Sequence, residues 1–202
     1  MDRLAGRLRD RSPASVLRVA VDGPPEAGGA ALASDLAARL PAAGRSALLV
    51  QAASFQRPAS VRLERGRDDP DAYYEDALDT GALWREVLGP LGPGGSRRYL
   101  PSLWDVTTDR SSRAVRRTAP GDAVVIVEGT FLLRPDLAAG FDVAVHLHLS
   151  AAARRRRVPA ASAARELPAY DRYDAEVAPM HGADLVVLWD DPVRPALVDR
   201  LG

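Results

Sequence analysis

The sequence predicts a single α/β domain with a parallel central sheet that is covered by helices on both faces. The runs from Leu17 to Val21 and from Ala123 to Val127 are continuously apolar, which is typical of strands buried on both sides. Helical patterns alternate with these runs along the chain, as expected for strands joined by crossover helices. A length of 202 residues fits one domain, and a hydrophobic content of 47% is enough to fill its core.

The same patterns assign the individual elements. Strands are expected at residues 17–21, 46–52, 123–127, 141–149 and 183–188. Helices are expected at residues 30–40, about 70–88 and 151 to about 165, the last interrupted at Pro159, and a helical turn or two is expected at residues 193–201. Residues 53–71 are polar and are expected to form an exposed functional loop, and residues 97–109 an extended segment. The basic extension at residues 1–15 is expected to form a short amphipathic helix, either packed on the body or loose.

Composition excludes several classes of function. The 27 basic and 27 acidic residues balance, so no global field recruits nucleic acid or an anionic membrane. The chain contains no cysteine, which excludes disulfides, thiolate zinc sites and cysteine nucleophiles. All of its basic residues are arginine, so it contains no lysine. The N-terminus lacks the apolar run of a signal peptide and no apolar stretch approaches 18 residues, which predicts a cytoplasmic protein.

A glycine-rich loop follows the first strand and has the outline of a phosphate-binding loop. Gly23 and Gly28 are separated by four residues, and a helix begins directly afterwards, as in the pattern G-x-x-x-x-G-K-[ST]. The pattern then requires a lysine for the β- and γ-phosphates and a hydroxyl for Mg²⁺, but this chain has Gly29 and Ala30. The loop therefore keeps the shape of the motif without its chemistry.

Two further residues make this loop unsuited to a triphosphate. Pro25 has no amide proton, and Glu26 brings a negative charge to the place of the phosphate oxygens. We expect the Glu26 carboxylate either to cap the following helix and fill the loop itself or to point to solvent. The plainest alternative is an ordinary turn between strand and helix, whose amides still suit an anion.

The carboxyl ends of the predicted strands carry the remaining candidate residues, because ligands of parallel sheets bind at that edge. Asp22 follows the first strand and suits either a metal or water ligand or a turn cap. Ser54 follows the second strand, but no histidine lies near it in the sequence to activate it as a nucleophile. Glu128 ends the third strand beside a glycine, which favours a functional role.

Two histidines alternate along a predicted strand and share one of its faces. His146 and His148 are suited to metal binding in this arrangement, but the strand offers no third ligand. Packing in a helix-covered core is the favoured interpretation of the pair.

A set of motifs in a fixed order resembles the uridine and cytidine kinase family of P-loop phosphotransferases, in particular its actinobacterial-style uridine kinases. The resemblance extends from about Leu17 to Pro192. The motifs are Val-Asp-Gly-Pro at 21–24, Ser-Phe-Gln-Arg-Pro at 54–58, Asp-Asp-Pro-Asp-Ala-Tyr-Tyr-Glu-Asp at 68–76, Gly-Pro-Gly-Gly-Ser-Arg-Arg-Tyr at 92–99, Trp-Asp at 104–105, Val-Glu-Gly-Thr-Phe-Leu-Leu-Arg-Pro at 127–135 and Tyr-Asp-Ala-Glu-Val-Ala-Pro at 173–179.

The resemblance implies a P-loop, nucleoside-kinase-like three-layer sandwich, with residues 1–202 as one domain and about 151–166 as a small lid. The family transfers the γ-phosphoryl group of ATP, with Mg²⁺, to the 5′-hydroxyl of a nucleoside. This transfer depends on a cation, a metal and a carboxylate base. The family's lysine, metal-ligating hydroxyl and catalytic aspartate correspond here to Gly29, Ala30 and Ala53.

Other family positions are retained, and the resemblance gives each a role. Asp68 corresponds to the acid that holds the ribose hydroxyls, and Trp104 to an aromatic residue beside the base. Asp109 lies where some relatives read the base with histidine, and Glu128 matches the acid that organises the metal. The arginines expected to clamp the triphosphate are Arg154, Arg155, Arg156 and Arg157.

Three functions follow from this pattern. The leading hypothesis is a degenerate uridine-kinase-like protein, a pseudokinase, that binds a nucleoside or nucleoside-like ligand with little or no ATP-dependent phosphotransfer. The second is an active kinase in which arginines replace the lysine and Asp22 or Glu128 is the base. The third is a pocket repurposed for other chemistry on a nucleoside-like metabolite. A homo-oligomer or a protein partner is compatible with each.

Overall fold

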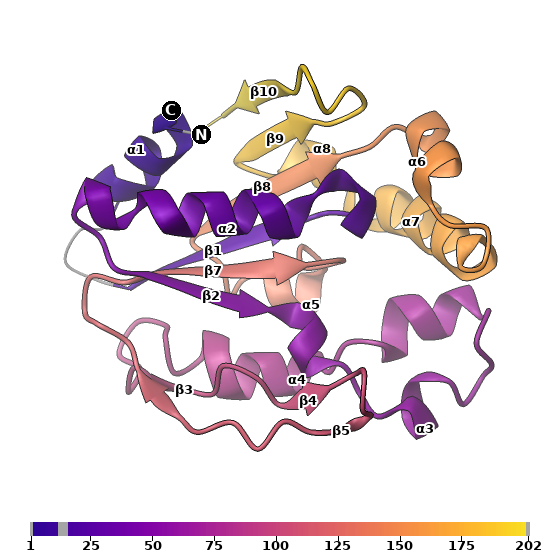
Figure 1. Ribbon diagram of the computed structural model, residues 1–202, viewed down its shortest axis with the longest axis horizontal. Helices are drawn as coiled ribbons and strands as arrows, with labels where there is room; N and C mark the ends of the chain where they lie inside the picture. The colour runs from indigo at the N-terminus through magenta and orange to yellow at the C-terminus, as the bar shows by residue number, and fades with distance from the viewer. Residues whose placement is uncertain (1, 12–15, 201–202) are drawn as a thin grey trace.

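The computed structural model describes residues 2–11 and 16–200, and its centre is a six-stranded sheet (Figure 1). The strand order is β10-β9-β8-β1-β7-β2. Five strands are parallel, and β10 pairs antiparallel with β9 at one edge. The strands are β1 (Leu17–Asp22), β2 (Ala47–Gln51), β7 (Val124–Gly129), β8 (Val143–His148), β9 (Leu185–Leu188) and β10 (Ala196–Asp199). This confirms the α/β class and the mostly parallel sheet.

Helices cover both faces of this sheet (Figure 1). On one face lie α1 (Asp2–Asp10) and α2 (Gly29–Arg39), which bury leucines at positions 4, 8, 32 and 36 against the strands. On the other face lie α4 (Thr80–Leu83), the π-turn η5 (Trp84–Leu88), α5 (Pro135–Ala138) and α7 (Ala163–Val177). Leu4 and Leu8 are buried, so the N-terminal helix packs on the body.

Shorter elements complete the chain. The 3₁₀ turns are η1 (Pro25–Ala27), η2 (Pro41–Ala43) and η3 (Ala52–Phe55), and the short α-helices are α3 (Ala59–Arg62), α6 (Ala151–Arg157) and α8 (Pro179–Gly182). A π-helical segment, η4, spans Ala72–Asp76, and two small ribbons are formed by β3 (Arg98–Tyr99) with β6 (Arg117–Thr118) and by β4 (Trp104–Asp105) with β5 (Arg110–Ser111). Over the described residues, no helix combines the length and apolar character needed to cross a membrane.

Strand register brings the chemically interesting side chains to one edge. Asp22 stands beside Gly129 on one neighbouring strand and His146 on the other, and Glu128 stands beside Gln51. All of these residues lie at the carboxyl ends of parallel strands. This edge faces α6 and α7 (Figure 1), and it is the edge where α/β sheets bind ligands.

Two helix predictions are wrong. The helix expected over residues 70–88 is broken at residues 77–79, where Asp79 donates its amide to the Phe55 carbonyl and Leu78 bridges Gln56. The backbone is therefore satisfied by the neighbouring segment, and Asp79 starts α4 by accepting from the Ala82 amide at 2.8 Å. The helical turn expected over residues 193–201 is wrong because Ala196–Asp199 forms β10 against the edge strand β9.

The helical region after the fourth parallel strand is longer than predicted. The interruption at Pro159 is confirmed, since α6 ends at Arg157 and α7 begins at Ala163. The prediction that this region ends near residue 165 is wrong, because α7 continues to Val177 and contains Pro168. Tyr170 and Tyr173 from this helix are buried against the second face of the sheet, and their packing favours the continuation.

Candidate functional site

A cavity of about 320 Å³ opens at the carboxyl edge of the sheet. One side, the strand-end wall, comprises Gln51, Ala52, Ala53, Glu128, Gly129 and Thr130. The opposite side, the helical wall, comprises Tyr73, Tyr74, Ala77 and Leu78. Pro25, Ala30, Gln56, Phe131 and Arg134 complete the lining. The volume lies at the lower end of the range of small-molecule sites, and the mixture of aromatic and amide groups suits an organic ligand.

The glycine-rich loop approaches this cavity with few amides to offer. The amides of Gly23, Ala27 and Gly28 donate to the carbonyls of residues 129, 24 and 25, and residues 24 and 25 are prolines without an amide proton. Gly28 is left-handed at φ +72°, which a glycine adopts without strain. From residue 23 to residue 28, only the Glu26 amide remains, and its proximity to the Glu26 carboxylate partly offsets the rise that burial causes in the pKa of that group.

The Glu26 side chain is positioned differently from either prediction. No side chain caps α2, so the capping prediction is wrong, and Oε2 of Glu26 is buried without a hydrogen-bond partner, so the carboxylate does not simply point to solvent. Burial raises the pKa of Glu26, and the nearby Glu166 carboxylate raises it further. The loop therefore places a carboxyl group where a triphosphate-binding loop has hydrogen-bond donors.

Glu128 occupies the place next to the missing lysine. A Cβ added at Gly29 would lie 3.0 Å from Glu128 Oε1, so the carboxyl group rests directly against the start of α2. Burial raises the pKa of Glu128. Ala30 and Ala53 line the cavity together with Glu128, and neither supplies a charge or a hydroxyl group. The phosphate side of the site is thus a carboxyl group among small apolar residues.

This burial makes a prediction about Glu128→Gln. Because the pKa is raised, the native state favours the protonated carboxyl group, and the ionised group at neutral pH lowers the free energy of unfolding of the wild type. This loss of stability disappears as the pH falls through the native pKa toward 4.5, the pKa of the unfolded chain. We expect the variant to be more stable than the wild type at neutral pH, with a gap that narrows as the pH approaches 4.5. Urea denaturation at both pH values measures this gap.

The matched control is Glu64→Gln, which alters an exposed glutamate outside the cavity lining. It should leave the free energy of unfolding unchanged at both pH values. A Glu128→Gln variant that is as stable as the wild type at neutral pH would contradict the prediction.

Asp22 belongs to the interior rather than to the cavity. Its side chain is fully buried, and it accepts hydrogen bonds from the Leu132 amide at 2.8 Å, the Tyr173 hydroxyl at 2.9 Å and His146 Nδ1 at 2.7 Å. A carboxylate oxygen accepts hydrogen bonds, so this contact corresponds to the tautomer of His146 that carries its proton on Nδ1. His146 packs in the core as expected, its ring centroid 6.0 Å from that of His148 on the same strand face. Within the described ranges no three potential ligands gather around a metal position.

The four arginines predicted to clamp a triphosphate have separate surroundings. Arg154 is buried and pairs with Asp171 at 3.1 Å and Asp174 at 2.7 Å, both on α7. Arg157 donates to the backbone carbonyls of residues 189 and 190. Arg155 and Arg156 are exposed. Two of the four therefore hold the segment 151–166 against the body, and no common anion site is formed by all four.

The three residues predicted to hold a nucleoside do not line the cavity. Asp68 is exposed. Trp104 and Asp109 do come together, since the indole Nε1 donates to Asp109 Oδ1 at 3.1 Å. The same oxygen accepts the Ala59 amide at 2.9 Å, so this carboxylate fixes the start of α3. Trp104 and Asp109 therefore contact each other, but neither lines the strand-end cavity.

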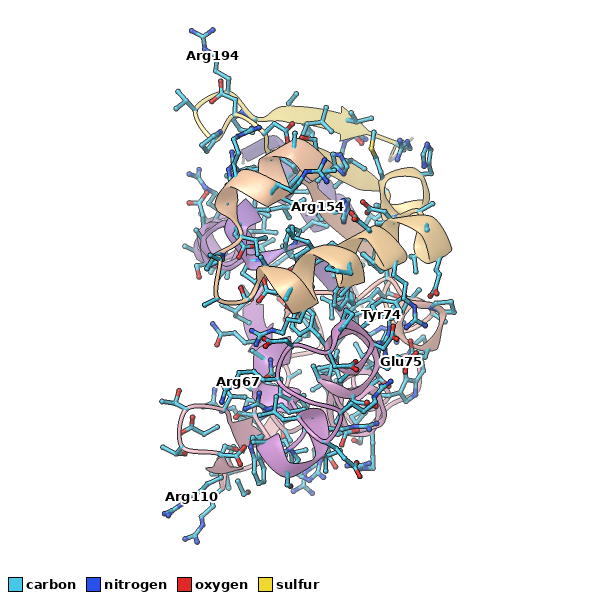
Figure 2. The ribbon with its side chains drawn as sticks, turned by 90° about the vertical axis from the view of Figure 1, so that its right-hand side faces the viewer. Arg67, Tyr74, Glu75, Arg110, Arg154 and Arg194 are labelled. Carbon is cyan, nitrogen blue, oxygen red and sulfur yellow. The ribbon has the colours of Figure 1, made fainter. Side chains whose placement is uncertain are left out.

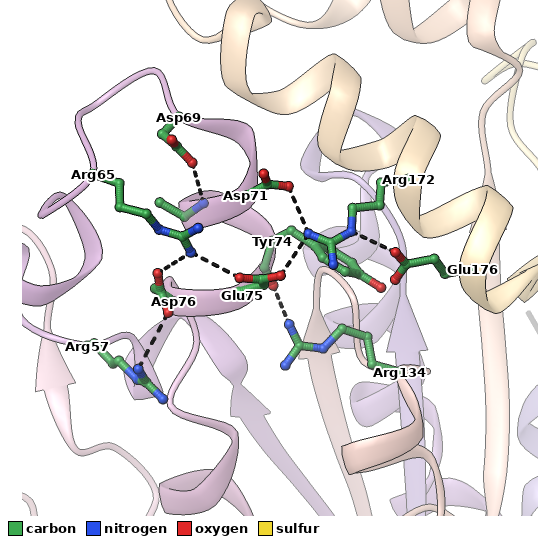
Figure 3. A network of polar contacts seen from close by, with 11 residues as sticks. Arg57, Arg65, Asp69, Asp71, Tyr74, Glu75, Asp76, Arg134, Arg172 and Glu176 are labelled. Atoms are coloured by element: carbon green, nitrogen blue, oxygen red, sulfur yellow. Dashed lines mark hydrogen bonds and ion pairs between the residues drawn. The ribbon is translucent and has the colours of Figure 1, made fainter.

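A polar network holds the helical wall from outside (Figure 3). Arg172 of α7 pairs with Asp71 and Glu75 at 2.8 and 2.9 Å, and its guanidinium lies 4.6 Å from the centre of the Tyr74 ring. Arg134 donates to the Tyr74 carbonyl from the other side. Further pairs join Arg57 and Arg65 to acids of η4. The segment that contributes the tyrosines is thereby tied to α7.

Sequence reasoning missed most of the cavity lining. Tyr73, Tyr74, Thr130 and Phe131 lie inside two quoted motifs, but no role was assigned to them individually. The available signal was the cluster of tyrosines after an acidic turn and a phenylalanine directly after a strand end. Phe131 has φ +63°, a conformation unusual for a bulky residue and a sign of a constrained position.

Comparison with known proteins adds the fold relationship. Neither a family model nor a curated protein matches the sequence. A possible uridine kinase from Bacillus stearothermophilus superposes with a TM-score of 0.74 at 21% identity, covering 92% of this chain and 95% of that one.

Two other kinase structures are similar. A protein from Silicibacter sp., provisionally described as a fructose transport system kinase, gives a TM-score of 0.55 at 25% identity, covering 91% and 87% of the two chains. A D-glycerate 3-kinase from Cryptococcus neoformans gives 0.53 at 15% identity, covering 96% and 83%. With its mostly parallel sheet, its glycine-rich loop after β1 and these neighbours, the chain has the uridine-kinase-like fold of the P-loop kinases.

Proposed function

We propose that this chain is a small-molecule binding protein on a kinase fold, which takes a nucleoside-like ligand in the strand-end cavity and has little or no ATP-dependent phosphotransfer. The observation that carries the proposal is the phosphate side of the cavity, where Ala30 and Ala53 supply neither a charge nor a hydroxyl group. Gly29 stands where the family resemblance implies a lysine, so this position supplies no cation beside the Glu128 carboxyl group that rests against it.

Magnitudes favour loss of phosphotransfer. A charge-stabilising cation contributes roughly 10³ to 10⁵ to the rate of phosphoryl transfer, and a positioned base contributes roughly 10² to 10⁴. Here the corresponding positions are Gly29 and Ala53, and no lysine exists elsewhere in the sequence. Arg154 does not compensate, because Asp171 and Asp174 already neutralise it. Partial additivity of these losses already removes most of a kinase's turnover.

The other side of the cavity supports ligand binding. Tyr73, Tyr74 and Phe131 offer aromatic faces for a ring, and Gln51 and Gln56 place amide groups among the lining residues. Such a combination of apolar surface and a few polar groups is what small-molecule sites use for affinity and orientation. The similar structure described as a possible uridine kinase makes uridine the first probe.

Isothermal titration tests the proposal directly. Uridine, cytidine, adenosine and guanosine are titrated into the protein, followed by Mg·ATP in a separate series. We expect heat from at least one nucleoside and none from Mg·ATP. A thermal-shift screen serves as a second measurement, since a ligand at 100 times its Kd adds about 2.7 kcal/mol to stability.

The variant Glu128→Gln tests whether the nucleoside binds in the strand-end cavity. It should weaken binding of the nucleoside that gives heat, whereas Glu64→Gln, which changes an exposed glutamate, should bind as the wild type does. Nanomolar Mg·ATP binding, or ADP release that depends on a nucleoside, would overturn the loss of phosphotransfer. Absence of heat with all four nucleosides would overturn the choice of ligand.

A further inference from the structure

A second, smaller cavity adjoins the first and is lined by arginines. This arginine recess has a volume of about 80 Å³. Its cationic residues are Arg62 at the end of α3, Arg67 in the following loop and Arg165 in the first turn of α7. The three arginines come from separate segments, so the recess is produced by the tertiary fold and not by a run of basic residues in the sequence.

Two of these arginines have donors that the protein leaves unused. The Nε groups of Arg62 and Arg165 are both buried and have no hydrogen-bond partner. Buried donors are nearly always paired in native proteins, because an unpaired donor has lost its water without replacing it. Both atoms belong to residues that line the recess, so these two guanidinium groups keep hydrogen-bonding capacity that the described residues do not use.

The charges around the recess favour an anion. Among the residues that line it, Asp69 is the one acid beside three arginines. Outside the lining, Glu166 pairs with Arg165 at 3.2 Å. Arg62 lies near enough to Asp109 to add to the effect of the Ala59 amide in lowering the pKa of that carboxyl group. One oxygen of Asp69 is already occupied by the Ala72 amide at 2.7 Å. The Arg165 guanidinium also lies 5.4 Å from the centre of the Tyr73 ring, which orients it across the wall between the two cavities.

The recess and the strand-end cavity are neighbours that share part of their lining. Gln56, Tyr73 and Ala77 line both. The recess therefore lies beside the place where a ring would pack against Tyr73 in the larger cavity. The glycine-rich loop contributes no residue to the recess, so an anion held there is separate from the phosphate position of the P-loop motif.

We propose that the cavity and the arginine recess form one site for a phosphorylated ligand, with the ring in the cavity and a phosphate monoester held by Arg62, Arg67 and Arg165. Three independent guanidinium groups match the three terminal oxygens of a phosphate monoester better than the two oxygens of a carboxylate. The ring part of this site rests on the proposed function. The ligand arrives with its phosphate already attached, so a phosphorylation must precede binding.

The test compares uridine with uridine 5′- and 3′-monophosphate by isothermal titration. We expect one monophosphate to bind at least about tenfold more tightly than uridine, because charge-assisted hydrogen bonds contribute at that scale. Arg67→Gln and Arg165→Gln should each reduce this preference about tenfold. Arg67 is exposed, so its variant keeps the fold even where Arg165→Gln loses the contact with Tyr73.

Arg194→Gln is the matched control. It removes the same charge from an exposed arginine at the opposite end of the molecule from Arg110, well away from Arg67 (Figure 2). This variant should keep the full preference for the monophosphate. A wild-type protein that binds uridine and both monophosphates equally would overturn the inference while leaving the proposed function intact.

A measurement with inorganic phosphate alone distinguishes failure of the arginine recess from failure of the proposed function. In a thermal-shift series, phosphate should stabilise the wild type and the Arg194→Gln variant, and Arg67→Gln should lose most of the shift. If no nucleoside or nucleotide binds but this phosphate effect is present, the recess is confirmed and the proposed function fails. If phosphate has the same effect on the wild type and on Arg67→Gln, the recess is not an anion site.

Discussion

Asp22→Ala should destabilise the protein by about 3–5 kcal/mol, because it removes one acceptor from three buried donors at once. The Leu132 amide, the Tyr173 hydroxyl and His146 Nδ1 all donate to this carboxylate. These donors come from the β7–α5 connection, α7 and β8, so the loss separates three parts of the fold from β1. Urea denaturation followed by circular dichroism measures the change.

Two further variants serve as controls for the Asp22→Ala measurement. Asp68→Ala changes an exposed aspartate and should alter stability by no more than about 0.5 kcal/mol. Asp22→Asn keeps one oxygen acceptor and should fall between the wild type and Asp22→Ala. If Asp22→Ala costs no more than Asp68→Ala, the buried cluster does not hold the fold together.

Phe131→Ala is expected to cost about 3–5 kcal/mol, the usual range for deleting a buried aromatic side chain. The ring is 5% exposed and lies within 5.0 to 5.6 Å, centre to centre, of four tyrosine rings. Those rings belong to η4 and α7, so Phe131 is the contact through which the strand-end wall packs against both. The same denaturation experiment measures the loss.

The backbone of Phe131 supplies an internal control. Its φ of +63° costs an alanine as much as a phenylalanine, whereas glycine adopts this conformation freely. Phe131→Gly should therefore be at least as stable as Phe131→Ala, although glycine usually destabilises a protein relative to alanine. Phe141→Ala, at a half-buried phenylalanine outside the cavity, should cost less than either. A glycine variant clearly less stable than the alanine variant would show that the positive φ carries no strain.

The strands that build the sheet were predictable because their apolar runs are continuous. The runs at 17–21 and 123–127 need burial on both faces, and a parallel sheet under helices provides it. The candidate edge followed from the same reasoning, and Asp22 and Glu128 do stand there. The family motifs added the fold, and the structural neighbours confirm it.

The side chains of the cavity were not predictable from periodicity. Tyr73 and Tyr74 are consecutive, yet both line it, because the π-helical turn of η4 widens the spacing on which a helical pattern relies. The strand at 196–199 was missed because a segment of four residues forms sheet only when an open edge is offered to it. The local sequence around Arg154 shows no acidic partner, because Asp171 and Asp174 lie 17 and 20 residues further along the chain. The prediction that Arg154 binds a ligand follows from that distance.

The two walls of the cavity differ in what holds them. The strand-end wall belongs to the sheet strands and the residues directly after them. The helical wall is held on the inside by its ring contacts with Phe131 and on the outside by the partly exposed ion pairs of Arg65 and Arg172 (Figure 3). Exposed pairs contribute about 0–1 kcal/mol each and weaken with ionic strength. Salt therefore weakens the outer contacts of η4 and leaves its ring contacts unchanged, so local opening of this segment becomes easier while the sheet stays intact. The rate of ligand exchange can thus respond to salt while the melting temperature of the domain hardly changes.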